Sequence, residues 1–347
     1  MNGRPYTRLG IIGRGGSSKV YKVMSQDNKL LAVKKVALAK ADPVTIKGYI
    51  NEIDLLKRLA HSEYIIRLID SEVNFERGFI LIGLECGEID LAHILQKHQD
   101  KPLNMNFVRM YWEQMLEAVH AIHEQKIVHS DLKPANFLLV AGTLKLIDFG
   151  IAKAIANDTT NIHREHQIGT VNYMSPEAIE DTNGAGPGAR RCMKLGRPSD
   201  VWSLGCILYQ MVYGRTPFAH LKNIYTKLRA IPDPNTPINF PDSMSIRDLM
   251  TVMKNCLQRD SRARMTIPEL LQHPFLRQDS HLSILQQELL TQPPLNIDNL
   301  KYIVKHVLHI VTTHPEMVER NGGARDRDID RITSVLWRTF EKYGPNH

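Results

Sequence analysis

The stretch HSDLKPAN at residues 129–136, together with DFG at residues 148–150, decides the fold of this chain. Phosphoryl transfer passes through a spread-out anionic transition state, so it depends on metal ions and positioned charges more than on covalent chemistry. Asp131 can accept the proton of a substrate hydroxyl, and Lys133 can hold the phosphate that is transferred. Asn136 and Asp148 can coordinate magnesium, a hard cation that prefers oxygen ligands. The stretch therefore predicts phosphoryl transfer from ATP to a hydroxyl group.

A glycine-rich segment precedes this stretch, with GRGGSSKV at residues 13–20. Glycines let the backbone approach phosphate groups closely and leave amide N–H groups to donate to them. The segment lies between two predicted strands, which disfavours a dinucleotide-binding fingerprint because that motif needs a helix after the glycines. The sequence contains no GxxxxGK[ST] pattern, so a P-loop is also disfavoured.

A lysine follows at the end of the apolar run LAVK, where the ammonium of Lys34 can reach the phosphates of ATP. Lys35 is the alternative, but the alternation of a strand places Ala32 and Lys34 on one face and Lys35 on the other. Glu52, on the helix predicted after this strand, is the natural carboxylate partner of Lys34, and Asp54 is its local competitor.

The secondary-structure signals change along the chain. Short apolar runs predict strands at Leu9–Ile12, Val20–Met24, Leu30–Val36 and Phe79–Leu84. A helix opens among them at Asp42 and Pro43. After residue 88 the signals are mainly helical, with a buried helix at Val201–Val212 and one apolar face made of Phe107, Met110, Tyr111, Met115, Val119 and Ile122. A strand-rich small lobe followed by a helix-rich large lobe is an α+β, two-lobe architecture.

The composition excludes several classes of protein. Hydrophobic residues make up 43% of the 347 residues, which is enough for a sizeable core. The four cysteines show no CxxC spacing, which argues against a structural zinc site or a disulfide framework and favours a reducing compartment, the nucleus or cytoplasm. We find no signal-peptide core after Met1 and no uncharged apolar run long enough for a bilayer, so no membrane partner is expected.

The net charge of +7 is partly gathered in one segment. Asp181–Pro198 mixes glycines and prolines with cations and predicts a flexible basic loop. Because no aromatic residues interleave with these cations, nucleic acid is disfavoured as a partner.

In order, these motifs resemble those of the eukaryotic protein kinase superfamily across roughly residues 6–276. The resemblance implies a bilobal kinase fold, with an N-lobe over about residues 6–87 and a C-lobe over about residues 88–276. Residues 277–347 lie beyond that fold and carry helical signals, so we expect a helical C-terminal extension. This extension is either a cap on the large lobe, a poorly ordered tail or an interaction module.

Four motifs narrow the resemblance to the monopolar-spindle kinases, which are dual-specificity kinases of the spindle assembly checkpoint. They are GSSKVY at 16–21, LECGEIDL at 84–91, VHSDLKPANF at 128–137 and GTVNYM at 169–174. The resemblance implies phosphorylation of serine and threonine, with some tyrosine, on kinetochore or checkpoint proteins. It also implies autophosphorylation through transient self-association, and localisation to nucleus and cytoplasm and to kinetochores and the spindle. The alternative is a pseudokinase scaffold, which the presence of Lys34, Asp131, Asn136 and Asp148 argues against.

The resemblance also implies roles for individual residues. Asp131, Lys133, Lys34 and Glu52 are the expected catalytic residues, and Asn136 and Asp148 are the expected magnesium ligands. The expected nucleotide contacts are Ile12, Gly13, Gly15, Gly16, Ser17, Ser18, Val20, Ala32, Lys34, Glu85, Cys86 and Gly87. Within this set, the backbone of Glu85 and Cys86 binds adenine, and Leu84 precedes them as the gate residue. Glu177 is expected to pair with Arg264, and Asp200 to begin a buried helix that supports the catalytic loop.

Two departures from the superfamily pattern stand out. Ser18 replaces the third glycine of the phosphate loop, and Ser130 replaces the arginine that usually precedes Asp131. In the wider superfamily that arginine grips a phosphate on the activation segment. A phosphate at Thr159 or Thr160 must therefore be held in another way, unless these two threonines are only solvated loop residues.

Overall fold

The computed structural model describes residues 1–15, 18–98, 104–149, 171–183, 196–241, 247–277 and 301. The chain divides into two units, Met1–Arg277 and Gln278–His347, and all elements given below belong to the first. Several predictions lie outside the described residues: those on Gly16, Ser17, Gly150, Thr159, Thr160, Gly169 and Thr170, and the prediction of a helical extension beyond residue 277, of which only Lys301 is described.

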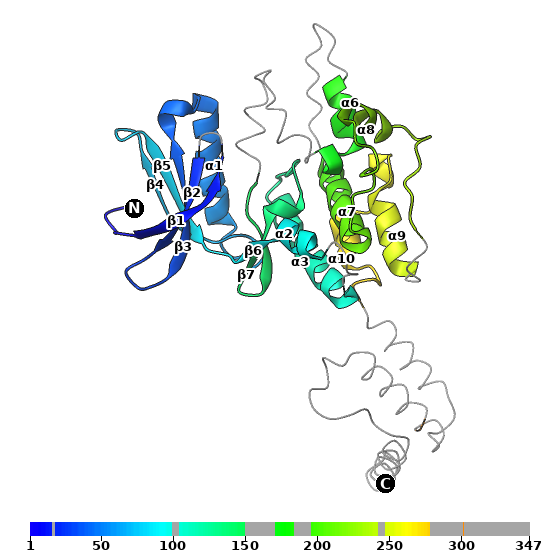
Figure 1. Ribbon diagram of the computed structural model, residues 1–347, viewed down its shortest axis with the longest axis horizontal. Helices are drawn as coiled ribbons and strands as arrows, with labels where there is room; N and C mark the ends of the chain where they lie inside the picture. Colours follow the sequence, from blue (N-terminus) through cyan, green and yellow to red (C-terminus); the bar gives the residue numbers. More distant parts are fainter. Residues whose placement is uncertain are drawn as a thin grey trace. The chain divides into compact units, whose positions relative to one another are not determined.

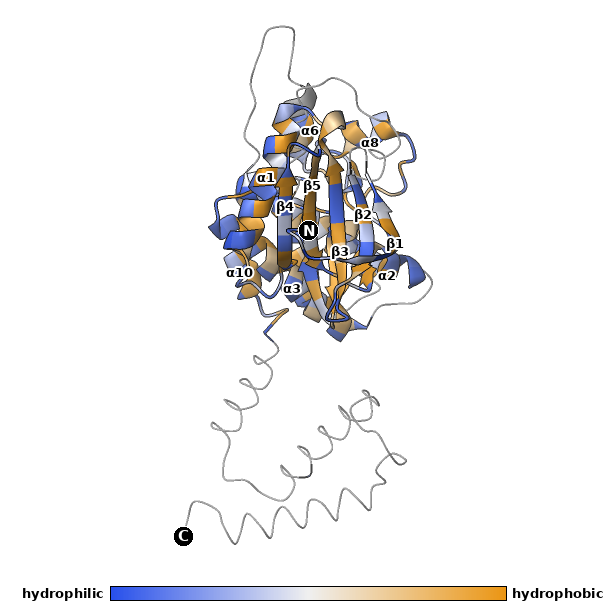
Figure 2. Cartoon of the chain, turned by 90° about the vertical axis from the view of Figure 1, so that its left-hand side faces the viewer, coloured by the Kyte–Doolittle hydropathy of each residue, from blue (hydrophilic) through white to orange (hydrophobic). Residues whose placement is uncertain are grey.

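An antiparallel sheet and one long helix form the N-lobe (Figure 1). The strands run in the order β1-β2-β3-β5-β4, and Figure 2 shows apolar residues concentrated on the central strands β3 and β5. The bounds are β1 Thr7–Arg14, β2 Ser18–Met24, β3 Leu30–Ala37, β4 Leu68–Asn74, β5 Phe79–Glu85, the short 3-10 helix η1 Leu38–Lys40 and the helix α1 Pro43–Arg58. The predicted start of α1 is confirmed, since the Asp42 carboxylate accepts the Thr45 N–H at 2.8 Å and caps the helix.

The C-lobe is mainly helical and carries a small three-stranded sheet in the order β6-β7-β8. Its strands are β6 Ile89–Asp90, β7 Phe137–Val140 and β8 Thr143–Leu146. Its α-helices are α2 Leu91–Lys97, α3 Met105–Glu124, α6 Pro176–Asn183, α7 Arg197–Tyr213, α8 Ile224–Ala230, α9 Arg247–Cys256 and α10 Ile267–Leu271, with 3-10 turns η2 Pro134–Asn136, η3 Val171–Tyr173 and η4 Ser261–Ala263. The predicted α+β, two-lobe architecture is confirmed.

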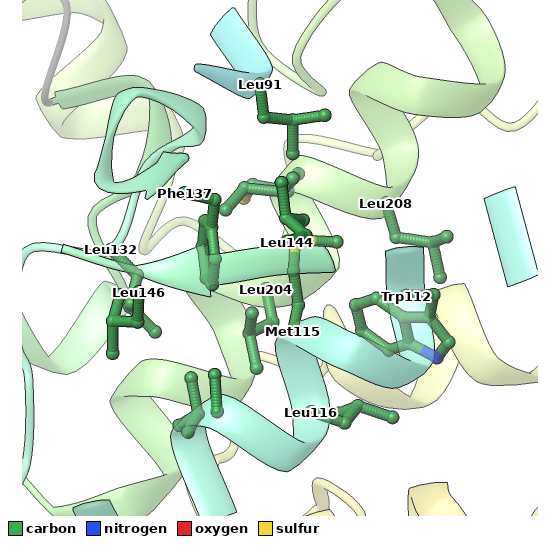
Figure 3. Close-up of a cluster of buried hydrophobic side chains, with 14 of the residues drawn as sticks. Leu91, Trp112, Met115, Leu116, Leu132, Phe137, Leu144, Leu146, Leu204 and Leu208 are labelled. Carbon is green, nitrogen blue, oxygen red and sulfur yellow. The ribbon is translucent and has the colours of Figure 1, made fainter. Parts of the chain in front are cut away.

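The C-lobe core lies between α3, α7 and the β7–β8 hairpin (Figure 3). Trp112 and Met115 on α3, Leu204 on α7 and Phe137 on β7 are all fully buried there. Burying one such large side chain stabilises the fold by about 1.5–3 kcal/mol, so this cluster holds the hairpin that leads to Asp148 firmly against the helices.

Two backbone hydrogen bonds join the loop after α1 to the C-lobe. The Leu146 N–H donates to the Tyr64 carbonyl at 2.9 Å, and the Ile66 N–H donates to the Leu146 carbonyl at 3.0 Å. Because Leu146 ends β8, these bonds place the segment that follows α1 beside the chain that continues to Asp148.

The structure also departs from the predictions at three places. Strand β4 was not predicted because its sequence LIDSEVN is largely polar, which an edge strand with only one neighbour tolerates. Met110, predicted on the buried face of α3, is 43% exposed, while Trp112 and Leu116 are buried instead. The loop predicted over Asp181–Pro198 is shorter at both ends, since α6 continues to Asn183 and α7 begins at Arg197.

Candidate active site

Residues 129–136 form the catalytic loop. It is anchored by Asp200, a fully buried residue in the first turn of α7. Its Oδ2 accepts the His129 N–H at 2.9 Å and the Nε2–H of His123 at 2.8 Å, and its Oδ1 accepts the Ser130 N–H at 2.9 Å. A buried carboxylate is tolerated when its oxygens are satisfied in this way. Asp200 therefore fixes the backbone that immediately precedes Asp131.

Ser130 adopts a left-handed backbone conformation, with φ of 61°. This region costs an L-amino acid roughly 1–2 kcal/mol. Asp200 holds the residue there by accepting the Ser130 N–H, and the Ser130 side chain is exposed. The turn at Ser130 directs the chain so that Asp131 follows at the edge of the site.

His129 connects the catalytic loop to Asp148. Its Nε2–H donates to the carbonyl of Asp148, and its Nδ1 accepts the N–H of Asp131 at 3.2 Å. Since one ring nitrogen donates and the other accepts, these partners define a neutral imidazole with the proton on Nε2. The backbones of Asp131 and Asp148, far apart in the sequence, are thereby tied to one ring.

Three of the predicted residues lie together in the catalytic loop. The Lys133 ammonium is 3.2 Å from Oδ2 of Asp131, and the Lys133 N–H donates to Oδ1 of Asn136 at 3.1 Å. Asn136 is buried, and its carbonyl accepts the N–H of Ile147 at 2.9 Å, which places it beside the residue that precedes Asp148. Asp131, Lys133, Asn136 and Asp148 are thus brought into one site.

The oxygens of Asn136 and Asp148 suit magnesium. Within the described ranges, no group of three or more His, Cys, Asp or Glu side chains could hold a metal ion, so protein side chains alone do not form a cage. Magnesium usually takes one or two protein oxygens, with phosphate oxygens and water completing its shell. An amide oxygen has two lone pairs, so Oδ1 of Asn136 can accept the Lys133 N–H and still coordinate a cation.

The predicted lysine–glutamate pair is formed in the N-lobe. The Lys34 ammonium lies 3.0 Å from Oε1 of Glu52, whose side chain is 4% exposed, and 5.0 Å from the ring centroid of Tyr49. Burial by itself would lower the pKa of Lys34, but the negative charges of Glu52 and Asp148, with a contribution from Tyr49, raise it above its ordinary value. Lys34 therefore stays charged and is poised to bind an anionic phosphate.

A Lys34→Met variant is expected to lower kcat by about 10²-fold, the usual effect of removing one preorganised donor to a developing anion. Steady-state kinetics at saturating ATP measures this. Lys35→Met is the matched control, because Lys35 is exposed and its ammonium lies over the ring of Phe79. A larger loss of kcat in the Lys35 variant would show that Lys35, and not Lys34, binds the phosphates.

The glycine-rich hairpin aligns with Lys34 across the sheet. Gly13 pairs with Val20 and Val20 with Lys34, so these three predicted site residues form one row across β1, β2 and β3, and the row continues to Ile82 on β5. At the tip, the Gly15 N–H donates to the Ser18 carbonyl at 2.8 Å and closes the turn. On the same face as Lys34, Ala32 pairs with Leu84 next to the hinge. Ile12 lies on β1 and is 53% exposed.

The hinge residues Glu85, Cys86 and Gly87 connect the two lobes. Only glycine fits at position 87, because a Cβ there would lie 2.6 Å from the Leu139 carbonyl oxygen and 2.5 Å from the Leu138 side chain. Cys86 is partly exposed, and its Sγ lies 3.7 Å from the carbonyl oxygen of Gly87. The hinge therefore runs directly against β7.

The Glu85 side chain links three segments, a role that the sequence alone did not indicate. Its Oε1 accepts the ammonium of Lys145 on β8 at 2.7 Å and the N–H of Arg67 at 2.8 Å, while its own N–H donates to the Arg67 carbonyl at 3.1 Å. The side chains of Glu85 and Lys145 are only 13% and 15% exposed. The pair therefore ties the hinge to the strand that leads to Asp148.

We expect Glu85→Gln and Lys145→Met to couple by about 1–2 kcal/mol in a double-mutant cycle of urea unfolding, as contacting residues do. The reason is that either single change leaves a poorly hydrated charge with fewer partners. The exposed pair Lys57–Asp54, with side chains 59% and 63% exposed, is the control and should couple by less than about 0.5 kcal/mol. Equal coupling in the two pairs would show that Glu85 and Lys145 contribute no more than a surface pair.

The predicted pair of Glu177 and Arg264 is also formed. Arg264 donates from Nη1 to Oε1 at 2.6 Å and from Nη2 to Oε2 at 2.8 Å, the two parallel bonds that guanidinium and carboxylate groups favour. Its guanidinium also lies 5.2 Å from the ring of Trp202 on α7. This pair fastens the first turn of α6 to the residue that follows η4.

Comparisons with known proteins agree with this geometry. The protein kinase domain family matches residues 6–276. The chain belongs to the protein kinase family. This kinase is 57% identical over 289 residues to serine/threonine-protein kinase mph1 of Schizosaccharomyces pombe, covering 78% of this chain and 42% of the relative.

Two further relatives are similar over much of this kinase. It is 56% identical to the probable serine/threonine-protein kinase mps1 of Dictyostelium discoideum, over 80% of this chain and 28% of the relative. It is 50% identical to dual specificity protein kinase TTK of Mus musculus, over 99% of this chain and 39% of the relative. The chain thus spans less than half the length of these relatives. The predicted resemblance to the monopolar-spindle kinases is confirmed, and the pseudokinase alternative finds no support, since each relative is named as a protein kinase.

Proposed function

We propose that this kinase transfers the γ-phosphate of ATP to serine and threonine hydroxyls of proteins, and to some tyrosines, in the spindle assembly checkpoint. The observation that supports this most is the joint placement of the site residues. His129 ties Asp131 to Asp148, and the charge of Lys34 is stabilised by both Glu52 and Asp148. A scaffold that only binds partners has no need for all of these charges in one place.

The chemistry follows from the side chains. Asp131 accepts the proton of the substrate hydroxyl as its oxygen attacks the phosphate, and Lys133, 3.2 Å from Asp131, offsets negative charge on the transferred group. Lys34 holds the phosphates from the N-lobe side, with Glu52 fixing the position of its ammonium. Asn136 and Asp148 would hold magnesium, and the bound ion would neutralise part of the phosphate charge.

Incubation of the protein with γ-labelled ATP, magnesium and a protein substrate, followed by mapping of the modified residues, tests this proposal. We expect label on serine and threonine, a smaller amount on tyrosine, and label on Thr159 or Thr160 of the chain itself. If the kinase is folded and the substrate still carries no label, the result would favour the pseudokinase hypothesis. Label on tyrosine alone would contradict the substrate class.

We also propose a checkpoint role, with kinetochore proteins as substrates, transient self-association during autophosphorylation, and localisation in nucleus and cytoplasm and at kinetochores. This part rests on the resemblance that the quoted motifs carry, since the relatives' names give only serine/threonine and dual-specificity protein kinases. A fluorescently tagged chain in mitotic cells tests the localisation. Signal at kinetochores is expected before anaphase, and a uniform signal throughout mitosis would contradict it. Within the described part of the chain, no helix is long and apolar enough to pass through a lipid bilayer.

A further inference from the structure

A buried tyrosine of α1 contacts the lysine of the candidate site through its ring. Tyr49 is 8% exposed, and its ring centroid lies 5.0 Å from the ammonium of Lys34, whose side chain is 17% exposed. An aromatic ring carries partial negative charge on its face and attracts a cation within about 6 Å, more strongly where water is excluded. The Tyr49 ring therefore stabilises the charge of Lys34 at the place where that charge is used.

The spacing along α1 places Tyr49 beside Glu52. Residues three apart on a helix are neighbours on one face, and both of these residues are buried. Glu52 accepts hydrogen bonds from the Lys34 ammonium at 3.0 Å and 3.3 Å, one with each carboxylate oxygen. Lys34 on β3 is thus held by two residues of the same helix. Two such contacts restrict the long lysine side chain more than either alone, because a rotation that preserves one distance changes the other.

A ring and a carboxylate have different effects on the phosphates that Lys34 binds. An ammonium has three N–H donors, and each carboxylate oxygen that accepts one of them competes with a phosphate oxygen. A carboxylate also carries a full negative charge, which repels the phosphates. The ring attracts the ammonium while carrying no net charge, so it fixes the position of Lys34 without opposing ATP. One carboxylate and one ring therefore suit a lysine that must be held firmly and still bind an anion.

We propose that Tyr49 is a positioning residue of this kinase, whose ring acts with Glu52 to hold the Lys34 ammonium where it binds the phosphates of ATP. This inference rests on the proposed kinase function and adds to it a residue that none of the sequence motifs contains. Tyr49 acts through Lys34 and has no chemical role of its own. It also belongs to the apolar core, so its effect on Lys34 has to be separated from its contribution to packing.

Substitutions at position 49 test the role of the ring. In Tyr49→Leu we expect kcat at saturating ATP to fall by about tenfold, the factor that corresponds to one cation–π contact of a largely buried ammonium. Tyr49→Phe retains the ring and should keep kcat within about twofold of the unaltered kinase. An unchanged kcat in Tyr49→Leu would overturn the proposal. An equal loss in Tyr49→Phe would also overturn it, because the hydroxyl and not the ring would then matter.

A double-mutant cycle on kcat separates the contact with Lys34 from packing. When Tyr49→Leu is added to Lys34→Met, kcat should fall by less than about twofold further, since the ammonium is already absent. A further tenfold fall would overturn the proposal, because Tyr49 would then act through the packing of α1. If Tyr49→Leu is poorly folded, Tyr49→Met replaces it in both measurements, since methionine is an apolar side chain that adapts to irregular space.

Two matched controls should retain kcat within about twofold. Ile53→Val removes one methyl group from the same buried face of α1, and Phe79→Leu removes the ring that lies 5.3 Å from the ammonium of Lys35, a contact of the same kind away from the site. A tenfold loss in either control would overturn the proposal, since kcat would then respond to any disturbance of the N-lobe. Failure of the unaltered kinase to transfer phosphate would instead overturn the proposed function, and this inference with it.

Discussion

An Asp131→Ala variant is expected to lose phosphate transfer by about 10³-fold while still binding ATP, in line with the effect of a positioned general base. The carboxylate orients the substrate hydroxyl and accepts its proton, and it also holds the Lys133 ammonium at 3.2 Å. The predicted nucleotide contacts lie on other elements, β1, β2 and the hinge, so the affinity for ATP should change little. Radiolabel transfer and a direct ATP-binding titration measure the two quantities.

The matched control is Asp54→Ala, which removes a carboxylate from the exposed surface of α1. It should retain the transfer rate within about twofold, because surface substitutions away from special features have small effects. Full activity in Asp131→Ala would contradict the mechanism. Loss of ATP binding in the same variant would show that Asp131 holds the site together instead of acting on the hydroxyl.

An Asp200→Ala variant is expected to have the largest effect on stability, lowering the free energy of unfolding by about 3 kcal/mol or more. The change leaves three donors without their acceptor: the buried His129 N–H and His123 Nε2–H, and the partly buried Ser130 N–H. Urea unfolding measures this loss, with Asp54→Ala again as the control. A loss below about 1 kcal/mol would show that these donors find water or other acceptors easily.

Asp200 also sustains the backbone turn at Ser130, so its role in catalysis can be tested apart from stability. In the conservative Asp200→Asn variant, kcat should fall because Ser130 is no longer held firmly at φ of 61°. Adding Ser130→Gly removes the side-chain cost of that conformation and should restore part of kcat. No recovery, or a further fall, would show that Asp200 acts through folding stability alone.

Much of the site could be predicted because its residues are close together in the sequence. Asp131, Lys133 and Asn136 lie within one loop, and their short spacing alone brings their side chains near one another. The start signal at Asp42 and Pro43 likewise predicted α1, whose buried face includes Ile53 and Leu56. The strand β4 escaped prediction because an edge strand exposes polar side chains, which removes the alternation on which strand prediction depends.

Other features could not be predicted because they join distant parts of the chain. Lys145 carries no pattern that marks it as the partner of Glu85, 60 residues earlier. In the sequence, Lys227 resembles an ordinary surface cation, yet in the structure it is buried and donates to Asn172. Such partners depend on how α8, η3 and the hinge pack. The number of residues between two side chains does not give the distance between them in the folded chain.

The sequence by itself determined the class of chemistry, because phosphoryl transfer requires a particular set of charged and amide side chains in a particular order. It also singled out Ser130 as the residue that departs from the superfamily. Only the tertiary structure decided how that departure is accommodated, by Asp200 accepting the Ser130 N–H, and that Lys145 pairs with Glu85. The physical reason is that the free energy of a charge depends on the atoms within a few ångströms of it, and folding alone decides which atoms those are.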